Sequence, residues 1–317
     1  MKLLYIFFSE LNRNHLLFLT YLIIVIIKEI INKFYRPTPD IISSLNKYFF
    51  YSISDLFSFI PMLIIKKRSE SNKKYSLEKS STSKSIKYLY SDTRKLNLEE
   101  RVKRIFKLEI IISIFDFLGK YSNFIFYIII AKEEYFVKGM ELNAIFVFKI
   151  ITMCILSFFI LHFPFYKHHY FSLGINLIFL IVLVVIDQIN IFKEEDWVFP
   201  FFYTLVKILI NIFYTIEDVY GKVLLSLDSI SPYNLLFYRG IGVTIISILF
   251  FIVLIFVEIP DENGEKSCIF TRYWKIFENK INILYAILVT ITNFCYNINI
   301  FFIIDKFSPT HYAMANI

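Results

Sequence analysis

The amino-acid sequence predicts an all-α protein, a polytopic transmembrane helix bundle of about eight spans. Apolar residues make up 57% of its 317 residues and aromatic residues 19%, whereas soluble globular proteins are roughly 45–50% apolar. The excess collects in runs with few charges. About 20 apolar residues are enough for a helix to cross a hydrocarbon core ~30 Å thick, so each run is a candidate span.

Eight such runs follow one another along the chain, and each is expected to form one spanning helix. The polar segments between them are short, apart from a long one after the second run and a moderate one after the seventh. None is long enough for an ordinary soluble domain. In order, the runs are Leu16–Ile31, Tyr48–Ile65, Ile110–Ile130, Leu142–Phe163, Tyr170–Ile186, Val198–Ile216, Leu235–Val257 and Ile283–Ile304.

The first four runs differ in the polar residues and breakers that they contain. The stretch Leu3–Phe8 ahead of the first run is too short for a secretory signal, so the first run is expected to be retained. Pro61 lies inside the second run and predicts a kink there. The third run contains Asp116 and Lys120, which share a helical face at a spacing of four residues and can neutralise each other. Lys149 in the fourth run has no such local partner.

The last four runs contain fewer ionisable residues and more amides. The fifth contains no charged residue, and Pro200 at the first turn of the sixth is an ordinary helix start. Lys207 in the sixth run has no local partner, and Arg239 lies near the start of the seventh. In the eighth run, Asn293 and Asn297 share a face, which suits either hydrogen bonds between helices or contact with a solute.

The segment Lys66–Lys107 predicts the orientation of the chain in the membrane. It contains fourteen Lys or Arg and five Asp or Glu, a balance of +9. Because positive loops stay in the cytosol, this loop and the N-terminus are expected to be cytosolic, with Lys193–Asp196 on the opposite side. Such a patch could also attract anionic lipid or nucleic acid. Its Ser/Lys-rich sequence favours a disordered, solvated linker instead.

Ionisable and amide side chains inside the spans are the candidates for a functional site. Burying a charge in a bilayer costs several kcal/mol, so such residues commonly mark a solute or ion path. We expect Asp55, Asp116, Lys149, Lys207 and Asn293 to line a polar cavity. The two lysines must snorkel to the interface, pair across helices with Asp55 or Asp116, or face water.

The sequence lacks the motifs that are typical of several other classes of function. None of the five histidines belongs to a His-Glu-x-x-His motif or accompanies a plausible nucleophile, and the scattered glycines form no phosphate-binding loop. An ATP-driven pump is therefore disfavoured, and no cofactor is expected. Cys154, Cys268 and Cys295 lack metal-ligand spacing and are expected to be packing residues.

Three stretches contain loose motifs whose order and spacing together are informative. They are Ile114–Lys120, Asn123–Ile125, Met140, Asn143–Phe146 and Gly174–Leu177 in the first, Glu217–Tyr220, Lys222, Ser231–Tyr233, Phe237, Tyr238 and Gly240 in the second, and Phe307–Thr310, Ala313 and Met314 in the third. The first stretch resembles helices three to five of the drug/metabolite transporter superfamily. The second resembles helix six of these carriers, with its exit loop and the start of helix seven, and the third resembles the hairpin into helix nine. That superfamily includes EamA-type and nucleotide-sugar carriers.

The resemblance implies two five-helix repeats of inverted topology, with the solute path between them near the membrane midplane. Residues 1–188 would form the first repeat, and residues 197–317 an incomplete second repeat of three spans plus the start of a ninth. A chain that ends before the last two helices is expected to be inactive alone, whereas a form extended through them should take up solute.

The leading hypothesis is therefore a secondary carrier of a small organic solute, working by alternating access, and not an enzyme. Its expected partners are the lipid bilayer and the solute, without nucleic acid, and a homodimer is compatible with the sequence. We expect a multi-pass protein of a eukaryotic endomembrane or plasma membrane. One alternative is a truncated, non-transporting relative that acts as a binding or scaffold subunit. Another is a membrane enzyme, which would need catalytic residues that converge at one membrane face.

Overall fold

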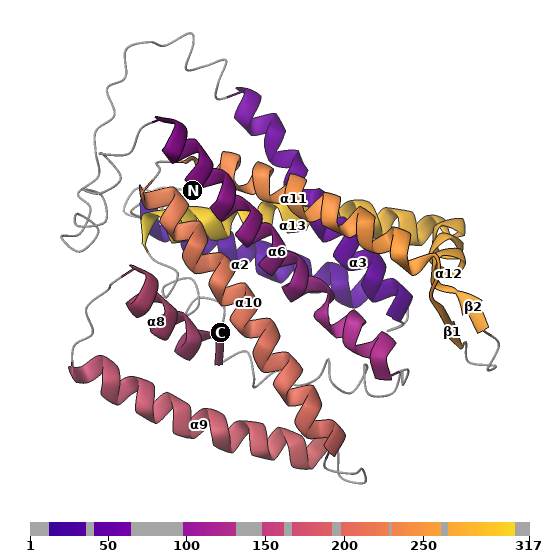
Figure 1. Ribbon diagram of the computed structural model, residues 1–317, viewed down its shortest axis with the longest axis horizontal. Helices are drawn as coiled ribbons and strands as arrows, with labels where there is room; N and C mark the ends of the chain where they lie inside the picture. The colour runs from indigo at the N-terminus through magenta and orange to yellow at the C-terminus, as the bar shows by residue number, and fades with distance from the viewer. Residues whose placement is uncertain are drawn as a thin grey trace, which may run out of the picture.

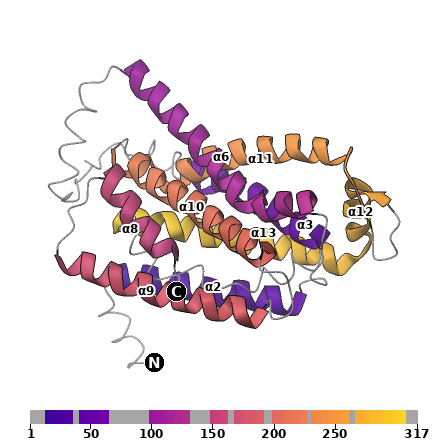
Figure 2. The same cartoon turned by 60° about the horizontal axis from the view of Figure 1, so that its bottom comes forward.

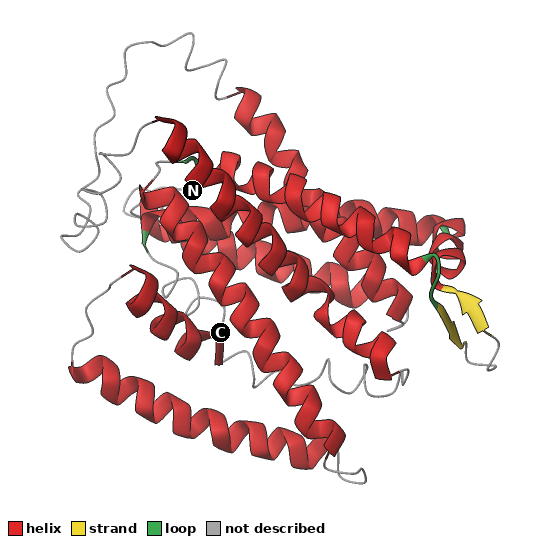
Figure 3. Ribbon diagram, in the orientation of Figure 1, coloured by secondary structure: helices red, strands yellow, loops and turns green. Residues whose placement is uncertain are grey.

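The computed structural model describes residues 13–35, 41–64, 98–130, 148–161, 167–191, 198–227, 230–260 and 266–307. Nearly all of them are helical (Figure 3). The strands among these residues form a short antiparallel hairpin of β1 (Glu258–Pro260) and β2 (Lys266–Cys268), at the end of the bundle that Figure 1 shows on the right. The protein is thus a helical bundle, as the sequence predicts.

The helices follow the predicted apolar runs in order. The part of the fourth run before Phe148 and after Leu161 lies outside the described residues. The helical elements are α2 (Arg13–Tyr35), α3 (Ile41–Ser54), the 3-10 helix η1 (Asp55–Ser58), α6 (Leu98–Ile130), α8 (Phe148–Leu161), α9 (Lys167–Ile191), α10 (Val198–Leu227), α11 (Pro232–Leu254), α12 (Ile269–Lys275), the 3-10 helix η3 (Ile276–Glu278) and α13 (Lys280–Lys306).

Two helices among the described residues, α11 and α13, are long and apolar enough to cross a membrane by length and composition. The helix α8 is apolar but shorter. Large apolar side chains are exposed on the outside of the bundle. Examples are Phe171 on α9, which is 72% exposed, and Phe159 on α8, which is 66% exposed. A bundle with two such helices and an apolar exterior is suited to contact with lipid.

The helix α6 begins earlier than the sequence indicated, at Leu98. Residues 98–107 are therefore helical, and the prediction that they belong to a disordered linker is wrong; residues 65–97 lie outside the described residues. Glu99 and Glu100 lie in the first turn, where negative charge interacts favourably with the helix dipole. Lys103 Nζ also contacts Glu99 Oε1 at 2.7 Å, one turn away. In Figure 2 this end of α6 projects beyond the rest of the bundle.

The helix α10 ends later than expected, at Leu227. The predicted sixth run stopped at Ile216, which left Glu217 and Asp218 near an exit loop. The apolar face continues past them, because Val219, Val223 and Leu224 are all buried. Both acidic side chains are thus held inside the bundle, at 4% and 5% exposed. This correction changes the composition of the site.

The second predicted run departs from regular α-helical geometry near Pro61. Residues Asp55–Ser58 form η1, and the chain returns to α-helix from residue 59. Pro61 has no amide hydrogen and cannot donate to the carbonyl four residues earlier, at Phe57. Within η1, the Ser58 hydroxyl donates to the Asp55 carbonyl oxygen at 2.6 Å. The irregular turn places the Asp55 side chain, which is fully buried, toward the neighbouring helix α11.

The core consists of α6 packed against α10 and α11, and of α13 packed against α2 and α3. The turn η1 lies on α11. Two glycines of α11 permit close approach: a Cβ at Gly240 would lie 2.9 Å from Asp55 Cβ, and one at Gly242 would lie 2.7 Å from Ser113 Cβ. At the edge, α8 packs on α10 and α9 packs on α8 (Figure 1).

Candidate functional site

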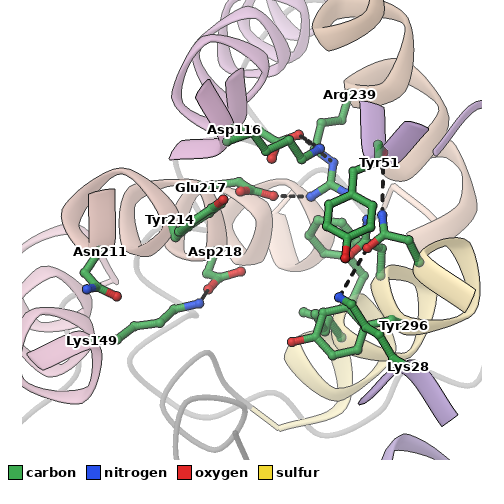
Figure 4. A pocket seen from close by; sticks show the side chains of 15 residues that line it. Lys28, Tyr51, Asp116, Lys149, Asn211, Tyr214, Glu217, Asp218, Arg239 and Tyr296 are labelled. Carbon is green, nitrogen blue, oxygen red and sulfur yellow. Dashed lines mark hydrogen bonds and ion pairs between the residues drawn. The ribbon is translucent and has the colours of Figure 1, made fainter. Parts of the chain in front are cut away.

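A polar cavity of about 270 Å³ lies in the middle of the bundle. Its volume is close to the lower end of the roughly 300–1,000 Å³ that is typical of small-molecule sites. Side chains of α2, α3, α6, α8, α10, α11 and α13 form its wall (Figure 4). They are Lys28, Tyr51, Asp116, Lys120, Lys149, Asn211, Tyr214, Glu217, Asp218, Arg239, Asn293, Tyr296, Asn297, Ile300 and Phe301.

Arg239 of α11 connects three carboxylates from three other elements. Its Nη2 donates to Asp55 Oδ2 of η1 at 2.6 Å, and its Nη1 donates to Glu217 of α10. Its Nε lies 3.8 Å from Asp116 Oδ2 of α6. The planar guanidinium suits such multiple contacts better than an ammonium does, and the Phe301 ring covers it at 4.9 Å. One side chain therefore ties four elements together.

Lys120 completes this cluster from α6. Its Nζ lies 2.7 Å from Asp116 Oδ2 and 3.9 Å from Asp55 Oδ2. The predicted pair of Asp116 with Lys120 is confirmed, because a spacing of four residues brings both side chains together on one helix. The other oxygen of Asp55 accepts from Asn297 Nδ2 at 2.7 Å, so α13 joins the cluster as well.

Lys149 pairs across helices at the other end of the cavity. Its Nζ lies 2.8 Å from Asp218 Oδ2, which links α8 to α10. We expected a cross-helix partner to be Asp55 or Asp116, and this expectation is wrong. Asp218 was placed near a loop because α10 was predicted to end too early. Figure 4 shows this pair at one side and the Arg239 contacts at the middle of the cavity.

Lys28 of α2 forms the opposite side of the cavity (Figure 4). Its Nζ lies 3.4 Å from Asn293 Oδ1, 3.9 Å from the centre of the Tyr296 ring and 4.9 Å from that of Tyr51. Aromatic faces attract cations at these distances. Lys28 was not among the predicted residues, although it lies within the first apolar run, and a search for every ionisable group inside the runs would have found it.

The five predicted residues are divided between the cavity and other parts of the bundle. Asp116, Lys149 and Asn293 line the cavity. Asp55 does not line the cavity, but it accepts a hydrogen bond from Arg239, which does. Lys207 lies elsewhere on α10, buried, with its Nζ 5.4 Å from the centre of the Tyr203 ring. The residues of α10 that line the cavity begin one turn further along, at Asn211.

The formal charges around the cavity balance. Four acidic and four basic side chains belong to it or to its ion pairs: Asp55, Asp116, Glu217 and Asp218 with Lys28, Lys120, Lys149 and Arg239. The described residues contain no cluster of three or more His, Cys, Asp or Glu that could hold a metal ion, and all three cysteines are free. Ammonium, guanidinium, carboxylate, amide and phenol groups are suited to binding a polar molecule by hydrogen bonds and charge.

Comparison with models of known protein families finds no match for this chain, and comparison with curated proteins finds none. The interpretation of the cavity therefore depends on the geometry of its own residues. That geometry consists of a small central space, a balanced set of buried charges and an apolar exterior.

Proposed function

We propose that this protein is a multi-pass membrane carrier and that the central cavity holds a small polar solute during alternating access. The observation that carries this proposal is the set of eight formally charged side chains around one small space inside an apolar bundle, six of them buried and two, Lys28 and Lys149, partly buried. A charged side chain at the centre of a bilayer costs about 2.5–3.5 kcal/mol on insertion scales. So many of them in one place are best explained by a water-filled or solute-filled path.

The pairing of helices supports an arrangement in two inverted repeats. If α2, α3 and α6 correspond to α10, α11 and α13, the contact of α6 with α10 corresponds to that of α13 with α2. The contact of α6 with α11 likewise corresponds to that of α13 with α3. The contact of α3 with α11 is unchanged by the exchange, because each helix takes the place of the other. All five contacts occur in the bundle. A pseudo-two-fold axis would produce this exchange, and carriers of this architecture bind their solutes where the repeats meet.

The proposal includes eight spans, a cytosolic N-terminus and a eukaryotic endomembrane or plasma membrane as the site of action. The charge of the segment between α3 and α6 supports this orientation through the positive-inside bias. Alternating access would then require α2, α3 and α6 to move relative to α10, α11 and α13 around the cavity. The contacts of Arg239 with α6 and η1 cross the boundary between these two groups.

The decisive experiment measures solute uptake into sealed vesicles that contain the purified protein. We expect uptake of at least one small polar solute above that of empty vesicles. The same solute should raise the unfolding temperature of the protein in detergent. The 317-residue chain is compared with a longer chain if the reading frame continues beyond Ile317.

Each other outcome selects a different function. Suppose that a solute stabilises both the 317-residue chain and the longer chain, but that neither chain carries it into the vesicles. This result would refute transport and favour a binding or scaffold subunit. Chemical conversion of the solute, detected by mass spectrometry, would favour a membrane enzyme. Protease treatment of sealed microsomes tests the orientation, because the Lys66–Lys107 segment should be cut from the cytosolic side.

A further inference from the structure

We infer that the solute of the central cavity is a zwitterion, a small molecule with one anionic and one cationic group and no net charge. This inference rests on the proposed function, because it names the substrate class of the same cavity. The anionic group would lie at Lys28, and the cationic group would lie at the carboxylates on the opposite wall. Three features of the cavity lead to this assignment.

The first feature is the different surroundings of its cations. Arg239, Lys120 and Lys149 each lie within ion-pair distance of a carboxylate. Lys28 is different, because among the described residues no carboxylate oxygen lies within 4.0 Å of its Nζ. Its contacts are the neutral Asn293 amide oxygen and the faces of two tyrosine rings.

An ammonium group has three N–H donors, so Lys28 retains donors for an anion that enters the cavity. The long distance of 3.4 Å to Asn293 Oδ1 indicates a weak hydrogen bond that a carboxylate could replace with a shorter one. The Tyr51 and Tyr296 side chains also line the cavity beside Lys28. They supply apolar faces and phenol groups next to the bound anion.

The second feature is the surplus of acid on the other side. The four carboxylates Asp55, Asp116, Glu217 and Asp218 share three cations, which leaves one formal negative charge without a cation. Glu217 and Asp218 are neighbours on α10, and both line the cavity together with Asp116. A protonated amine placed against them would gain charge-assisted hydrogen bonds. The Tyr214 ring lines the same side of the cavity and can also attract a cation.

The third feature is the neutral sum of the cavity. With four acids and four bases, the empty site has no net formal charge. A solute with a net charge would add an uncompensated buried charge to a low-dielectric space, which is strongly unfavourable. A zwitterion adds none, and its two ends meet the surplus charges of the two walls. The volume of about 270 Å³ restricts it to a small molecule.

Binding of charge-matched compounds tests the inference. The probes are sets of three: an α-amino acid, the amine that lacks its carboxylate, and the acid that lacks its amine. Affinity is measured by calorimetry and by the shift of the unfolding temperature, with the full chain in detergent. In at least one set, we expect the amino acid to bind at least tenfold more tightly than either singly charged compound.

Variants then assign the anionic group to Lys28. Lys28→Gln should reduce the affinity for the amino acid at least tenfold and leave the weak affinity for the amine unchanged. Lys28→Arg should restore much of the loss, which a purely structural role would not explain. Lys207→Gln is the matched control, since Lys207 is a buried lysine of α10 outside the cavity, and it should bind like the unmodified protein.

The inference and the proposed function fail in distinguishable ways. Equal or tighter binding of a singly charged compound, or full affinity in Lys28→Gln, overturns the zwitterion inference even if uptake is observed. Uptake of a net-charged solute that needs Lys28 would also overturn it and keep the carrier function. Lys28-dependent binding of an amino acid without uptake would keep the inference and refute transport. Gel filtration of each variant confirms that it is folded.

Discussion

Two buried carboxylates on the helix α6, seven residues apart, have opposite surroundings. Asp116 contacts Lys120 and Arg239 and lies in the wall of the cavity. Glu109, two turns earlier on the same face, has both carboxylate oxygens buried with no hydrogen-bond partner among the described residues. It borders a groove of about 910 Å³ between α6 and α11, lined mainly by apolar side chains such as Phe106 and Ile245.

The difference shows what decides the cost of a buried carboxylate in this bundle. Both side chains have lost contact with water, at 1% and 6% exposed. At Asp116 the lost hydration is offset by direct contacts with cations from α6 and α11. Glu109 makes no hydrogen bond with the described residues, and among them only the more distant charge of Arg239 favours its ionised form. Neutralisation is therefore expected to cost much more stability at Asp116 than at Glu109.

The largest effect is expected from Arg239→Gln. The change removes the shared cation of Asp55, Glu217 and Asp116 and leaves their charges buried. Breaking a buried ion pair in this way costs about 3–5 kcal/mol. Thermal unfolding in detergent should show a large loss of stability. Arg239→Lys should recover only part of it, because an ammonium cannot reproduce the planar fork. Full stability of Arg239→Gln would mean that the cluster does not hold the helices together.

Asp116→Asn should have the next largest effect. It removes the 2.7 Å ion pair with Lys120, while Lys120 keeps Asp55 at 3.9 Å as a partial substitute. Hydrogen bonds to charged groups contribute about 1.5–3 kcal/mol, so the unfolding free energy should fall by that order. Solute uptake should fall too. If Asp116→Asn is stable and transports normally, Asp116 is neither a structural nor a functional partner in the cavity.

Gly240→Ala tests the close packing of α11 beside the cluster. A methyl group there would lie 2.9 Å from Asp55 Cβ and 3.0 Å from the backbone nitrogen of Leu56, which cannot turn away. Overpacking typically costs about 1–3 kcal/mol. Gly174→Ala on α9 is the control, since no atom lies within 4 Å of its added Cβ, and Ala favours a helix over Gly. Equal stability of the two variants would show that α11 can move away from η1.

Local patterns in the sequence predicted the parts of this molecule that depend on short spacings. The order of the helices follows from the apolar runs, and the pair of Asp116 with Lys120 follows from its spacing of four residues. Lys149 and Asp218 are in contact although they lie 69 residues apart in the sequence, and Arg239 and Asp55 are in contact although they lie 184 residues apart. No periodicity specifies such pairs, because tertiary packing decides which faces meet.

The predicted end of α10 also affected the prediction of the site. Hydropathy alone ended the sixth run at Ile216, because two acids follow it, although the buried Val219 and Val223 show that the helical face continues. Glu217 and Asp218 were consequently left out of the candidate site. Lys207, which the same run contains, was included and lies outside the cavity. A charged residue next to an apolar run is thus a poor sign of the end of a buried helix.

The smallest change in stability is expected from Glu109→Gln, although Glu109 is nearly as buried as Asp116. No partner is lost among the described residues, and the amide has almost the shape of the carboxylate that it replaces. The unfolding free energy should therefore change by less than about 1 kcal/mol, because the ordinary cost of such a change comes from the partner left behind.

A second variant distinguishes an idle carboxylate from one with a function. Glu109→Leu removes the unpartnered oxygens and adds apolar surface next to the groove between α6 and α11. Replacing uncompensated buried polar atoms in this way is often neutral or stabilising, so its unfolding temperature should equal or exceed that of Glu109→Gln. If both variants fold but lose uptake, Glu109 acts in the transport cycle despite its lack of a partner. If Glu109→Gln is instead as unstable as Asp116→Asn, the carboxylate has a cation partner outside the described residues, and the contrast between the two carboxylates of α6 disappears.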